Sequence, residues 1–488
     1  MVTLRNILAV LLLFCAFEGK AQIAFYRVFG GKGYDRGEGI AQLPDSSYII
    51  TGSSSSFENA PSQAFLLKLN KNGYHVWSKE YGGPEFEEGR RVIFVPNYGY
   101  YIVGTSSSSG SGNFDGYVVF TDLSGNQQWE KWYDRGGWER FHDAILMPDT
   151  SIVMFGETNA NPEETEDQYA VRIDKNGQII WQFQQGGVGV DYFNKGVKVT
   201  DTTFAVVGTG YLADSLKSKA SIAYYHIDGS LLWDTLTGSN GEYILNDVQF
   251  YFNRLMCVGE KIRTGKTDKD NYQVFLSVGG AFISDEDSYN PNSNRYACFV
   301  NYTAPPGDKY FLVTQGNDPQ YSYPGGEDCV INRFSSSFYW DGYGAGYNGL
   351  GQDQINQIIQ TNDGYAATIG YHSDPGYTTG GTSLFIVKLG NDNNFPASGN
   401  PTVYNILSVE NLENQPDFAY YPNPVNDVLY IDAHSPFDQL EVTDLSGKRV
   451  FSTNQPLTSI ETVSWNQGTY LLRFAVNGNW YTRKVVKW

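Results

Sequence analysis

Four tryptophans lie 52 residues apart along this chain of 488 residues: Trp77, Trp129, Trp181 and Trp233. Each follows a short turn that ends in glycine, such as the turn from Asn70 to Gly73. A fixed period of this size indicates a repeat architecture, in which each unit buries its apolar surface against its neighbours. The period therefore constrains the fold more than any other feature, and we expect the tryptophans to pack each unit against the next.

A second marker, a glycine near the end of an apolar strand, counts the units. It occurs seven times, at Gly52, Gly104, Gly156, Gly208, Gly259, Gly316 and Gly370. The second unit illustrates the four strands that we expect in each: 90–96, 100–107, 115–122 and 127–133. Turn signals separate them, and the high content of aromatic residues (15%) and glycine (53 residues) favours strands and turns. Four strands per unit are typical of a propeller blade.

The two ends of the repeat complement each other. The seventh unit ends after its third strand, 383–389, whereas residues 24–31 resemble a fourth strand without a unit of its own. We expect these two strands to pair and close a ring, which would remove open sheet edges. A linear solenoid with polar caps is the alternative. The predicted fold is all-β, a seven-bladed β-propeller closed by an N-terminal strand and followed by a small C-terminal β-sandwich.

The N-terminus has the pattern of a signal peptide. Arg5 precedes an apolar run over 7–17, and small residues at Gly19 and Ala21 predict cleavage after Ala21. A lipoprotein site at Cys15 is less favoured, because Phe14 stands where a small residue is expected. The expected domains are a signal peptide (1–21), a propeller (22–390), a linker (391–415) and the β-sandwich (416–488).

Charge and cysteine content exclude several classes of function. The net charge of −19 disfavours nucleic acids and anionic membranes as partners. Beyond the signal peptide, Cys257, Cys298 and Cys329 form no disulfide framework, and no cluster of cysteine and histidine suggests a metal. No apolar run after the signal peptide is long enough for a transmembrane helix. We therefore expect no metal, no cofactor and no transmembrane segment.

Four strands in chain order place the long b–c and d–a loops on one face, here called the loop-rich face, and the short turns on the other. Variable loops on a rigid scaffold are a common place for binding, although every propeller has such a face. Aromatic side chains stack on sugars and anchor protein interfaces, so we expect a glycan or a protein as ligand. The candidate contacts are Tyr34, Trp138, Tyr192, Tyr211, Tyr321, Tyr323, Tyr343, Tyr347 and Tyr377.

Two sets of charged residues follow the same period. The first comprises Asp35, Glu87, Glu139 and Asp191. Because a specific site seldom needs the same residue in every unit, we expect these carboxylates to bond loop N–H groups or a neighbouring blade, with cation or sugar binding as the alternative. The second comprises Arg91, Asp143, Lys195 and Asp247. Their alternating signs predict ion pairs between adjacent units near the channel, because buried charges need partners.

Catalysis has little support in the sequence, and no catalytic residue is assigned. His142 with Asp143, and His372 with Asp374, lie in different units. Three arginines could imitate the arginine cluster of propeller glycosidases: Arg36, Arg91 and Arg140. A secreted carbohydrate-active enzyme with channel carboxylates therefore stays an alternative to a binding protein, as does a structural component of a surface complex.

Four motifs mark the end of the chain. They are Tyr421-Pro422-Asn423-Pro424, Val442-x-Asp444-x-x-Gly447-Lys448, Gly468-Thr469-Tyr470 and Lys484-Val485-Val486-Lys487. Residues 416–488 thereby resemble the type A C-terminal sorting domain of the type IX secretion system of Bacteroidetes, with Trp465 as a departure. The repeats are similar to Bacteroidetes surface propellers.

This resemblance implies an export route. The signal peptide would direct the chain to the periplasm, and the type IX translocon and sorting machinery would then recognise the C-terminal domain. Cleavage in the linker, followed by release or attachment at the outer-membrane surface, would complete the route. A compact terminal module on a tether is physically suited to such recognition.

Overall fold

The computed structural model describes residues 24–56, 61–109, 113–160, 165–212, 217–267, 269–288, 296–303, 308–316, 328–335, 340–347, 351–373, 381–390, 402–405, 418–433, 437–444, 448–455, 457–476 and 479–488. The expected signal peptide lies outside these residues. The chain divides into two compact units, 1–408 and 409–488. In the part that the structure describes, no helix has the length and apolarity needed to cross a bilayer.

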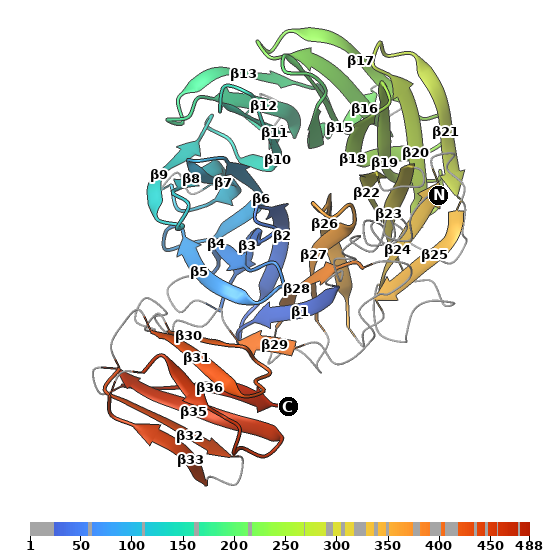
Figure 1. Cartoon of the computed structure of the whole chain (residues 1–488). Helices are drawn as coiled ribbons and strands as arrows, with labels where there is room; N and C mark the ends of the chain where they lie inside the picture. Colours follow the sequence, from blue (N-terminus) through green and yellow to red (C-terminus); the bar gives the residue numbers. More distant parts are fainter. Residues whose placement is uncertain are drawn as a thin grey trace, which may run out of the picture. The chain divides into compact units, whose positions relative to one another are not determined.

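The first unit contains six antiparallel sheets that each have four strands in chain order, as expected for propeller blades (Figure 1). Sheet 1 comprises β2 (Asp35–Gln42), β3 (Tyr48–Ser54), β4 (Gln63–Leu69) and β5 (His75–Tyr81). Sheet 2 comprises β6 (Glu87–Val95), β7 (Gly99–Ser106), β8 (Asp115–Thr121) and β9 (Gln127–Tyr133). Sheet 3 comprises β10 (Glu139–Leu146), β11 (Ile152–Thr158), β12 (Asp167–Ile173) and β13 (Ile179–Gln185).

The next three sheets have the same organisation. Sheet 4 comprises β14 (Tyr192–Lys198), β15 (Thr203–Leu212), β16 (Lys217–His226) and β17 (Leu231–Thr237). Sheet 5 comprises β18 (Glu242–Tyr251), β19 (Arg254–Ile262), β20 (Lys269–Ser277) and β21 (Phe282–Ser288). Sheet 6 comprises β22 (Tyr296–Thr303), β23 (Asp308–Gly316), β24 (Asp328–Ser335) and β25 (Trp340–Tyr347).

Sheet 7 combines both ends of the repeat. Its order is β26 (Asp353–Gln360), β27 (Ala366–His372), β28 (Ser383–Lys388), β1 (Phe25–Gly30) and β29 (Thr402–Asn405). The expected pairing of the N-terminal strand with the third strand of the seventh unit is confirmed, because β1 runs antiparallel to β28. The outermost strand β29 pairs parallel with β1. It lies within 391–415, which we expected to be a linker; its sequence Thr-Val-Tyr-Asn contains three residues that favour strands.

Neighbouring sheets share apolar cores. One buried cluster joins each pair of consecutive sheets from 1 to 7, and a further cluster joins sheet 7 to sheet 1 through Phe29, Ile40 and Ile369. Both faces of each sheet are therefore covered, which explains why every residue of central strands such as β7 and β12 is buried.

The periodic tryptophans hold consecutive units together, as predicted. A Cβ atom on the turn glycine of the following unit would approach the tryptophan ring to between 2.8 and 3.1 Å. The pairs are Trp77 with Gly125, Trp129 with Gly177, Trp181 with Gly229 and Trp233 with Gly280. Each of these glycines has a positive φ, between 73° and 89°. In β1 the same register position is Phe25, whose ring lies 2.4 Å from a Cβ atom built on Gly73.

The first strand of each sheet lies nearest the centre around which the sheets are arranged (Figure 1). Six of these innermost strands have a β-bulge at the same register position, which inserts one residue. The inserted residues are Glu38, Arg90, His142, Asn194, Asn246 and Asn356. Two of them donate a side-chain hydrogen bond of 2.9 Å to a carbonyl oxygen of the next sheet: Asn194 to Leu245 and Asn356 to Gly37.

The second unit has two sheets around one apolar core. The smaller contains β30 (Phe418–Tyr421), β31 (Val428–Ala433) and β34 (Ser459–Glu461). The larger contains β33 (Arg449–Thr453), β32 (Gln439–Asp444), β35 (Gly468–Val476) and β36 (Asn479–Lys487). Leu429 and Ile460 of the first sheet pack with Val442, Leu472 and Val485 of the second. This arrangement agrees with the small β-sandwich expected from the sequence.

Candidate functional site

The periodic carboxylates are structural, as expected. All four are buried, and each accepts the backbone N–H of the residue four positions earlier, at 2.7 to 3.3 Å. The pairs are Asp35 with Gly31, Glu87 with Gly83, Glu139 with Arg135 and Asp191 with Gly187. These bonds satisfy loop donors that would otherwise be orphaned. The carboxylates therefore fix the d–a loops and leave recognition to other residues.

The predicted ion pairs between units are confirmed for three of the four periodic charges. Asp143 is fully buried and lies 3.3 Å from Nε of Arg91 and 3.4 Å from Nζ of Lys195. It also accepts the N–H of Gly196 at 3.1 Å. Asp247 accepts the N–H of Val248 at 2.8 Å. The carboxylate of Asp143 in sheet 3 thus forms ion pairs with both neighbouring sheets, 2 and 4.

A charged cluster lies at the loop-rich end of the innermost strands of sheets 1 to 3. We call it the axial cluster, and it consists of Glu38, Glu88, Arg90, Arg140, His142 and Glu157. Three members, Glu38, Arg90 and His142, are the bulge residues of β2, β6 and β10. A bulge changes the direction in which the inserted side chain points, which brings these three side chains into the cluster. Later units carry asparagine at this position.

Ion pairs connect the members of the axial cluster. Arg90 lies 3.0 Å from Glu88 and 3.8 Å from Glu38. Arg140 lies 3.3 Å from Glu157. The Arg90 and Arg140 side chains keep 42% and 35% of their surface exposed, so solvent and ligands can reach them.

His142 joins the cluster to sheet 4. Its Nδ1 lies 3.0 Å from the carbonyl oxygen of Phe193, a contact that requires a proton on Nδ1. Its Nε2 lies 4.0 Å from Glu157. Burial lowers the pKa of His142 despite the attraction of Glu157, so the ring is neutral at pH 7.

The carboxyl groups of the cluster differ in their ionisation. Burial raises the pKa of Glu38 to about 7. Attraction to Arg90 acts to lower this pKa, and repulsion from Glu88 acts to raise it. Burial acts to lower the pKa of Arg90, but Glu88 and Glu38 together raise it. The site therefore contains a carboxyl group that can donate a hydrogen bond near neutral pH, beside a permanent cation.

Aromatic side chains flank the axial cluster, including candidates named from the sequence. The guanidinium of Arg140 stacks 4.2 Å from the ring of Trp138 and 5.1 Å from that of Phe114. Tyr192 meets His142 edge-on at 5.9 Å. Tyr34, a further candidate, directly precedes β2 and is 61% exposed, and its ring has no stacking contact with the residues of the cluster, all of which the structure describes.

The remaining aromatic candidates that the structure describes lie on other strands. Tyr211 donates its backbone N–H to Asp191 at 2.5 Å. Tyr343 and Tyr347 lie on β25. Three candidates fall outside the described residues: Tyr321, Tyr323 and Tyr377.

Three arginines were singled out from the sequence, and the structure uses each differently. Arg140 belongs to the axial cluster, Arg91 is paired with Asp143, and Arg36 stacks 4.7 Å from the ring of Tyr371. Sequence reasoning missed Arg90, because only the bulge turns it away from the register of Arg91. It also missed Glu38, Glu88 and Glu157, which join through Arg90 and Arg140.

The two histidine motifs are not brought together. His142 lies on β10 of sheet 3 and His372 on β27 of sheet 7. His372 is buried and meets the ring of Phe385 at 6.0 Å. Asp374 lies outside the described residues.

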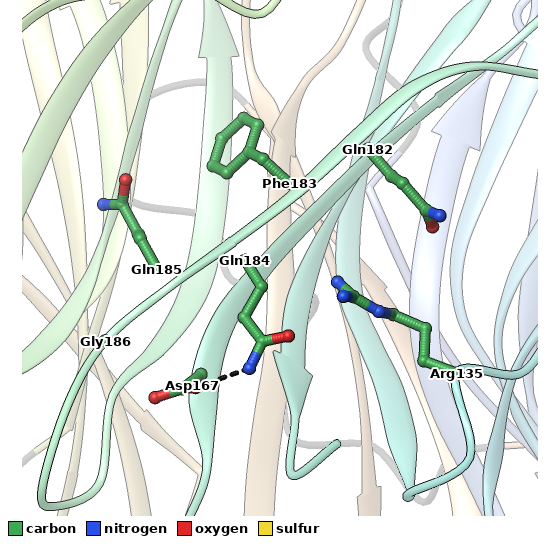
Figure 2. A pocket seen from close by; sticks show the side chains of 7 residues that line it. All are labelled: Arg135, Asp167, Gln182, Phe183, Gln184, Gln185 and Gly186. Atoms are coloured by element: carbon green, nitrogen blue, oxygen red, sulfur yellow. Dashed lines mark hydrogen bonds between the residues drawn. The ribbon is translucent and has the colours of Figure 1, made fainter. Parts of the chain in front are cut away.

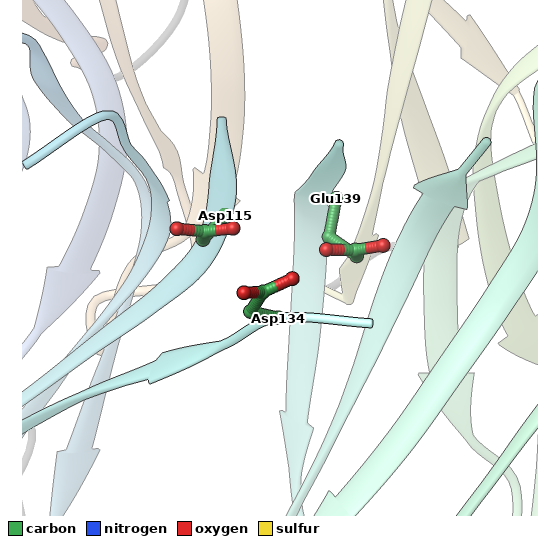
Figure 3. Close-up of side chains that lie close together, drawn as sticks. All are labelled: Asp115, Asp134 and Glu139. Carbon is green, nitrogen blue, oxygen red and sulfur yellow. The ribbon is translucent and has the colours of Figure 1, made fainter. Parts of the chain in front are cut away.

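Asp115, Asp134 and Glu139 are the acidic group with suitable spacing for a cation in the part of the chain that the structure describes (Figure 3). Their oxygens lie within 4.8 Å of one another. Glu139 is already engaged by Thr158 and the N–H of Arg135, and Asp134 accepts the N–H of Gly136. Calcium needs six to eight oxygen ligands, so these three groups do not define a metal site.

A pocket of about 560 Å³ lies beside the outermost strand of sheet 3. Arg135, Asp167 and residues 182–186 line it, and Figure 2 shows Gln184 reaching across to Asp167, which it contacts at 2.6 Å. The guanidinium of Arg135 lies 5.2 Å from the ring of Tyr169. Most of the lining side chains are polar.

Several motif residues of the C-terminal unit stabilise its fold. Asn423, in the motif Pro422-Asn423-Pro424, accepts the N–H of Val486 at 2.8 Å. Asp444 accepts the N–H of Lys448 at 3.0 Å, across a turn whose Gly447 is not among the described residues.

Other motif residues lie on the two long strands of the larger sheet. Tyr470 of β35 donates to Asn466 at 2.8 Å and packs 4.8 Å from Trp465. Val485 of β36 is fully buried. Gly468 begins β35 at a φ of 153°.

Comparison with known protein families supports the resemblance of the C-terminal unit to a sorting domain. Residues 419–488 match the family of secretion system C-terminal sorting domains. No curated protein matches the chain in sequence.

The solved structures that are similar to this chain include two propeller-type domains. The Pan2 WD40 domain of Neurospora crassa is 9% identical over 72% of this chain and 90% of its own, with a TM-score of 0.42. The β-propeller domain of the Trilobed protease from Pyrococcus furiosus is 9% identical over 77% and 99%, with a TM-score of 0.41. The chain is a protein with a C-terminal sorting domain, which implies export by the type IX secretion machinery, and an all-β first unit of propeller-type sheets.

Proposed function

We propose that this protein is an exported glycan-binding protein whose loop-rich face binds the sugar. The axial cluster carries the proposal. A structural device would recur along the repeat, as the buried carboxylates and the tryptophans do in four units each, whereas Glu38, Arg90 and His142 differ at one register position. The exposed guanidinium of Arg90 offers donors for hydroxyl groups, and Trp138 offers a face for stacking.

We further propose that the seven sheets are the blades of one closed ring. The supporting observations are the pairing of β1 with β28, the apolar cluster between sheets 7 and 1, and the bond from Asn356 to Gly37. A closed ring would hold the d–a loops of sheets 1 to 4 in fixed positions around the axial cluster. Such rigidity reduces the entropy lost when a ligand binds.

The export route adds a location to this function. We propose that the signal peptide is cleaved after Ala21 and that the chain crosses the periplasm. The type IX machinery at the outer membrane would then recognise the sorting domain. The propeller would afterwards be released or attached to the cell surface. A glycan-binding module is useful at this location, because glycans surround the cell.

A glycan array with the full chain lacking residues 1–21 tests the proposal, together with a pull-down for protein ligands. Binding to a defined glycan class should fall about tenfold or more in Trp138→Ala and Arg140→Ala. The matched control is Tyr98→Ala, because Tyr98 is 57% exposed in a short turn on the opposite face. Absence of glycan binding, or equal loss in the control, would refute the proposal.

A second candidate is glycoside hydrolysis, and one observation favours it. Glu38, with its pKa raised to about 7, shares Arg90 with Glu88, so a neutral acid can stand beside a carboxylate. If this candidate holds, a glycan bound by the array should release reducing ends over time. Glu38→Gln should abolish that release and leave glycan affinity intact.

A further inference from the structure

The a–b turns connect the first and second strands of each sheet on the face opposite the loop-rich face, and the turn of sheet 5 departs from the others. Tyr251 of β18 pairs with Arg254 of β19, so only Phe252 and Asn253 connect the two strands. Both have a positive φ, 45° and 60°, as in a two-residue turn of type I′. Such a turn favours asparagine or glycine, and a bulky side chain at positive φ is strained. The positive-φ residues in the a–b turns of sheets 1 to 3 are small or polar: Ser46, Asn97 and Thr150.

The strained side chain is also the most exposed one of its kind. Phe252 is 71% exposed, the largest fraction among the large apolar side chains in the part of the chain that the structure describes. Its ring meets that of the neighbouring Tyr251 edge-on at 4.1 Å. An isolated exposed apolar residue needs no explanation. Backbone strain, however, clusters at sites that bind or switch, so its combination with exposure indicates a contact site at this turn.

An apolar hollow of about 350 Å³ lies on the same face, between the a–b turns of sheets 2, 3 and 4. Val95 and Pro96 of one turn and Leu146, Met147 and Pro148 of the next form its apolar wall. Pro96 and Pro148 are exposed, so solvent reaches this wall. Because an apolar cavity of about 150 Å³ binds benzene, the hollow has room for a phenyl ring.

Phe252 and the apolar hollow are placed for contact between two copies. Trp181 of sheet 3 donates to the carbonyl oxygen of Ile227 in sheet 4, and Trp233 of sheet 4 donates to that of Val278 in sheet 5, each at 2.9 Å. These bonds hold the short turns of the three sheets side by side on one face. A two-fold axis lying in that face, between Phe252 and the hollow, would put the ring of each copy over the hollow of the other. Such a contact closes into a dimer with two identical halves.

Charges beside the two features are complementary. Arg254 follows the turn and is exposed. At the rim of the apolar hollow, the side chains of Asp149 and Asp201 are 55% and 80% exposed. Their cationic partners, Arg172 and Lys198, are less exposed, at 10% and 42%. The charge that the rim presents to a second molecule is therefore mainly negative, and it would attract the guanidinium of Arg254.

We propose that this face is an interface between two copies of the chain, in which Phe252 of each copy fills the apolar hollow of the other and Arg254 approaches Asp201. Burial of an aromatic side chain in an apolar pocket is the usual centre of a protein interface. The contact uses no residue of the axial cluster, so it is independent of the proposed glycan binding. One dimer would carry two glycan sites, which raises avidity for a branched or repeated ligand.

Sedimentation equilibrium of the full chain lacking residues 1–21, between about 1 and 100 μM, tests the interface. The average mass of the wild type should rise with concentration toward twice the monomer mass. Phe252→Asn should raise the dissociation constant about tenfold or more. The melting temperature at low concentration should not fall in this variant, because asparagine suits the positive φ of the turn. Val188→Asn is the control, since Val188 is 68% exposed in a d–a loop of the loop-rich face and should leave association unchanged.

A mixture of two variants tests the contact itself. Pro96→Arg places a long charged side chain in the apolar hollow and should weaken association as Phe252→Asn does. A dimer of one Phe252→Asn copy and one Pro96→Arg copy keeps one intact contact, whereas a dimer of either variant alone keeps none. The equal mixture should therefore associate more tightly than either variant.

Three outcomes would overturn the inference. They are a wild type that stays monomeric at 100 μM, association that Phe252→Asn leaves unchanged, and a mixture that associates no more tightly than its components. Flotation with phosphatidylcholine vesicles examines the other occupant of an exposed aromatic turn. A monomeric wild type that floats with the vesicles, and loses this property in Phe252→Asn, would assign the turn to a lipid surface instead of a second copy.

Discussion

Replacement of Asp143 by asparagine tests the charge links between units. Asp143 is fully buried, and its carboxylate faces Arg91 at 3.3 Å and Lys195 at 3.4 Å. The amide of Asp143→Asn can still accept the N–H of Gly196, so the change removes mainly the charge. Two cations whose side chains are 24% and 20% exposed would then lack their common partner.

The expected cost follows from these exposures. Breaking a fully buried ion pair costs about 3–5 kcal/mol, and partial exposure of both cations reduces this to about 2–4 kcal/mol. The entropy of unfolding, about 2 cal/mol/K per residue, converts this loss to a fall of about 2–5 °C in melting temperature for a unit of this size.

Differential scanning calorimetry at pH 7 measures the change, and a double-mutant cycle isolates its cause. Asp143→Asn should cost less in an Arg91→Met background, because one unpaired cation is then already absent. Asp201→Asn is the control, since Asp201 forms an exposed pair with Lys198 and is itself 80% exposed. The reasoning would be refuted if Asp143→Asn lowered the melting temperature no more than Asp201→Asn.

Three further predictions concern the tryptophan contact, the axial cluster and the fifth strand of sheet 7. Gly177→Ala should destabilise the chain by about 1–3 kcal/mol in urea unfolding, because φ is +73° and the new Cβ would meet Trp129 at 2.9 Å. Burial raises the pKa of the Glu38 carboxyl group to about 7, so its contribution to stability is full below pH 4.5 and is lost as the pH rises through 7. The melting temperature of the wild type should therefore fall over this pH range, and that of Glu38→Gln should change less. Truncation after residue 400 should lower the melting temperature relative to truncation after residue 408, because only the shorter chain lacks β29 (Thr402–Asn405); equal values would contradict its role.

The period of the sequence was sufficient to predict the strands, their order and the contacts of the tryptophans. The pairing of β1 with β28 also followed from register, since the N-terminal strand lies 52 residues before β5 and β28 lacks a successor. The N-terminal strand lacks the tryptophan of this register, and the structure shows that Phe25 makes the equivalent contact with Gly73. A short strand such as β29 lacks any periodic partner and cannot be distinguished from a linker by pattern.

The candidate site was only partly predictable. Trp138, Arg140 and His142 were named from the sequence, but Arg90 was passed over for Arg91, because a bulge changes which side chain turns toward the centre. A bulge depends on backbone geometry that residue type does not determine.

Hydrogen exchange with and without a bound glycan tests the central claim most directly. We expect slower exchange in the d–a loops that carry the axial cluster, 82–91 and 134–143, upon glycan binding. The turns of the opposite face, 70–77 and 122–129, should exchange at the same rate in both states. Protection confined to these turns, or no protection in either set of segments despite saturation with glycan, would contradict the account.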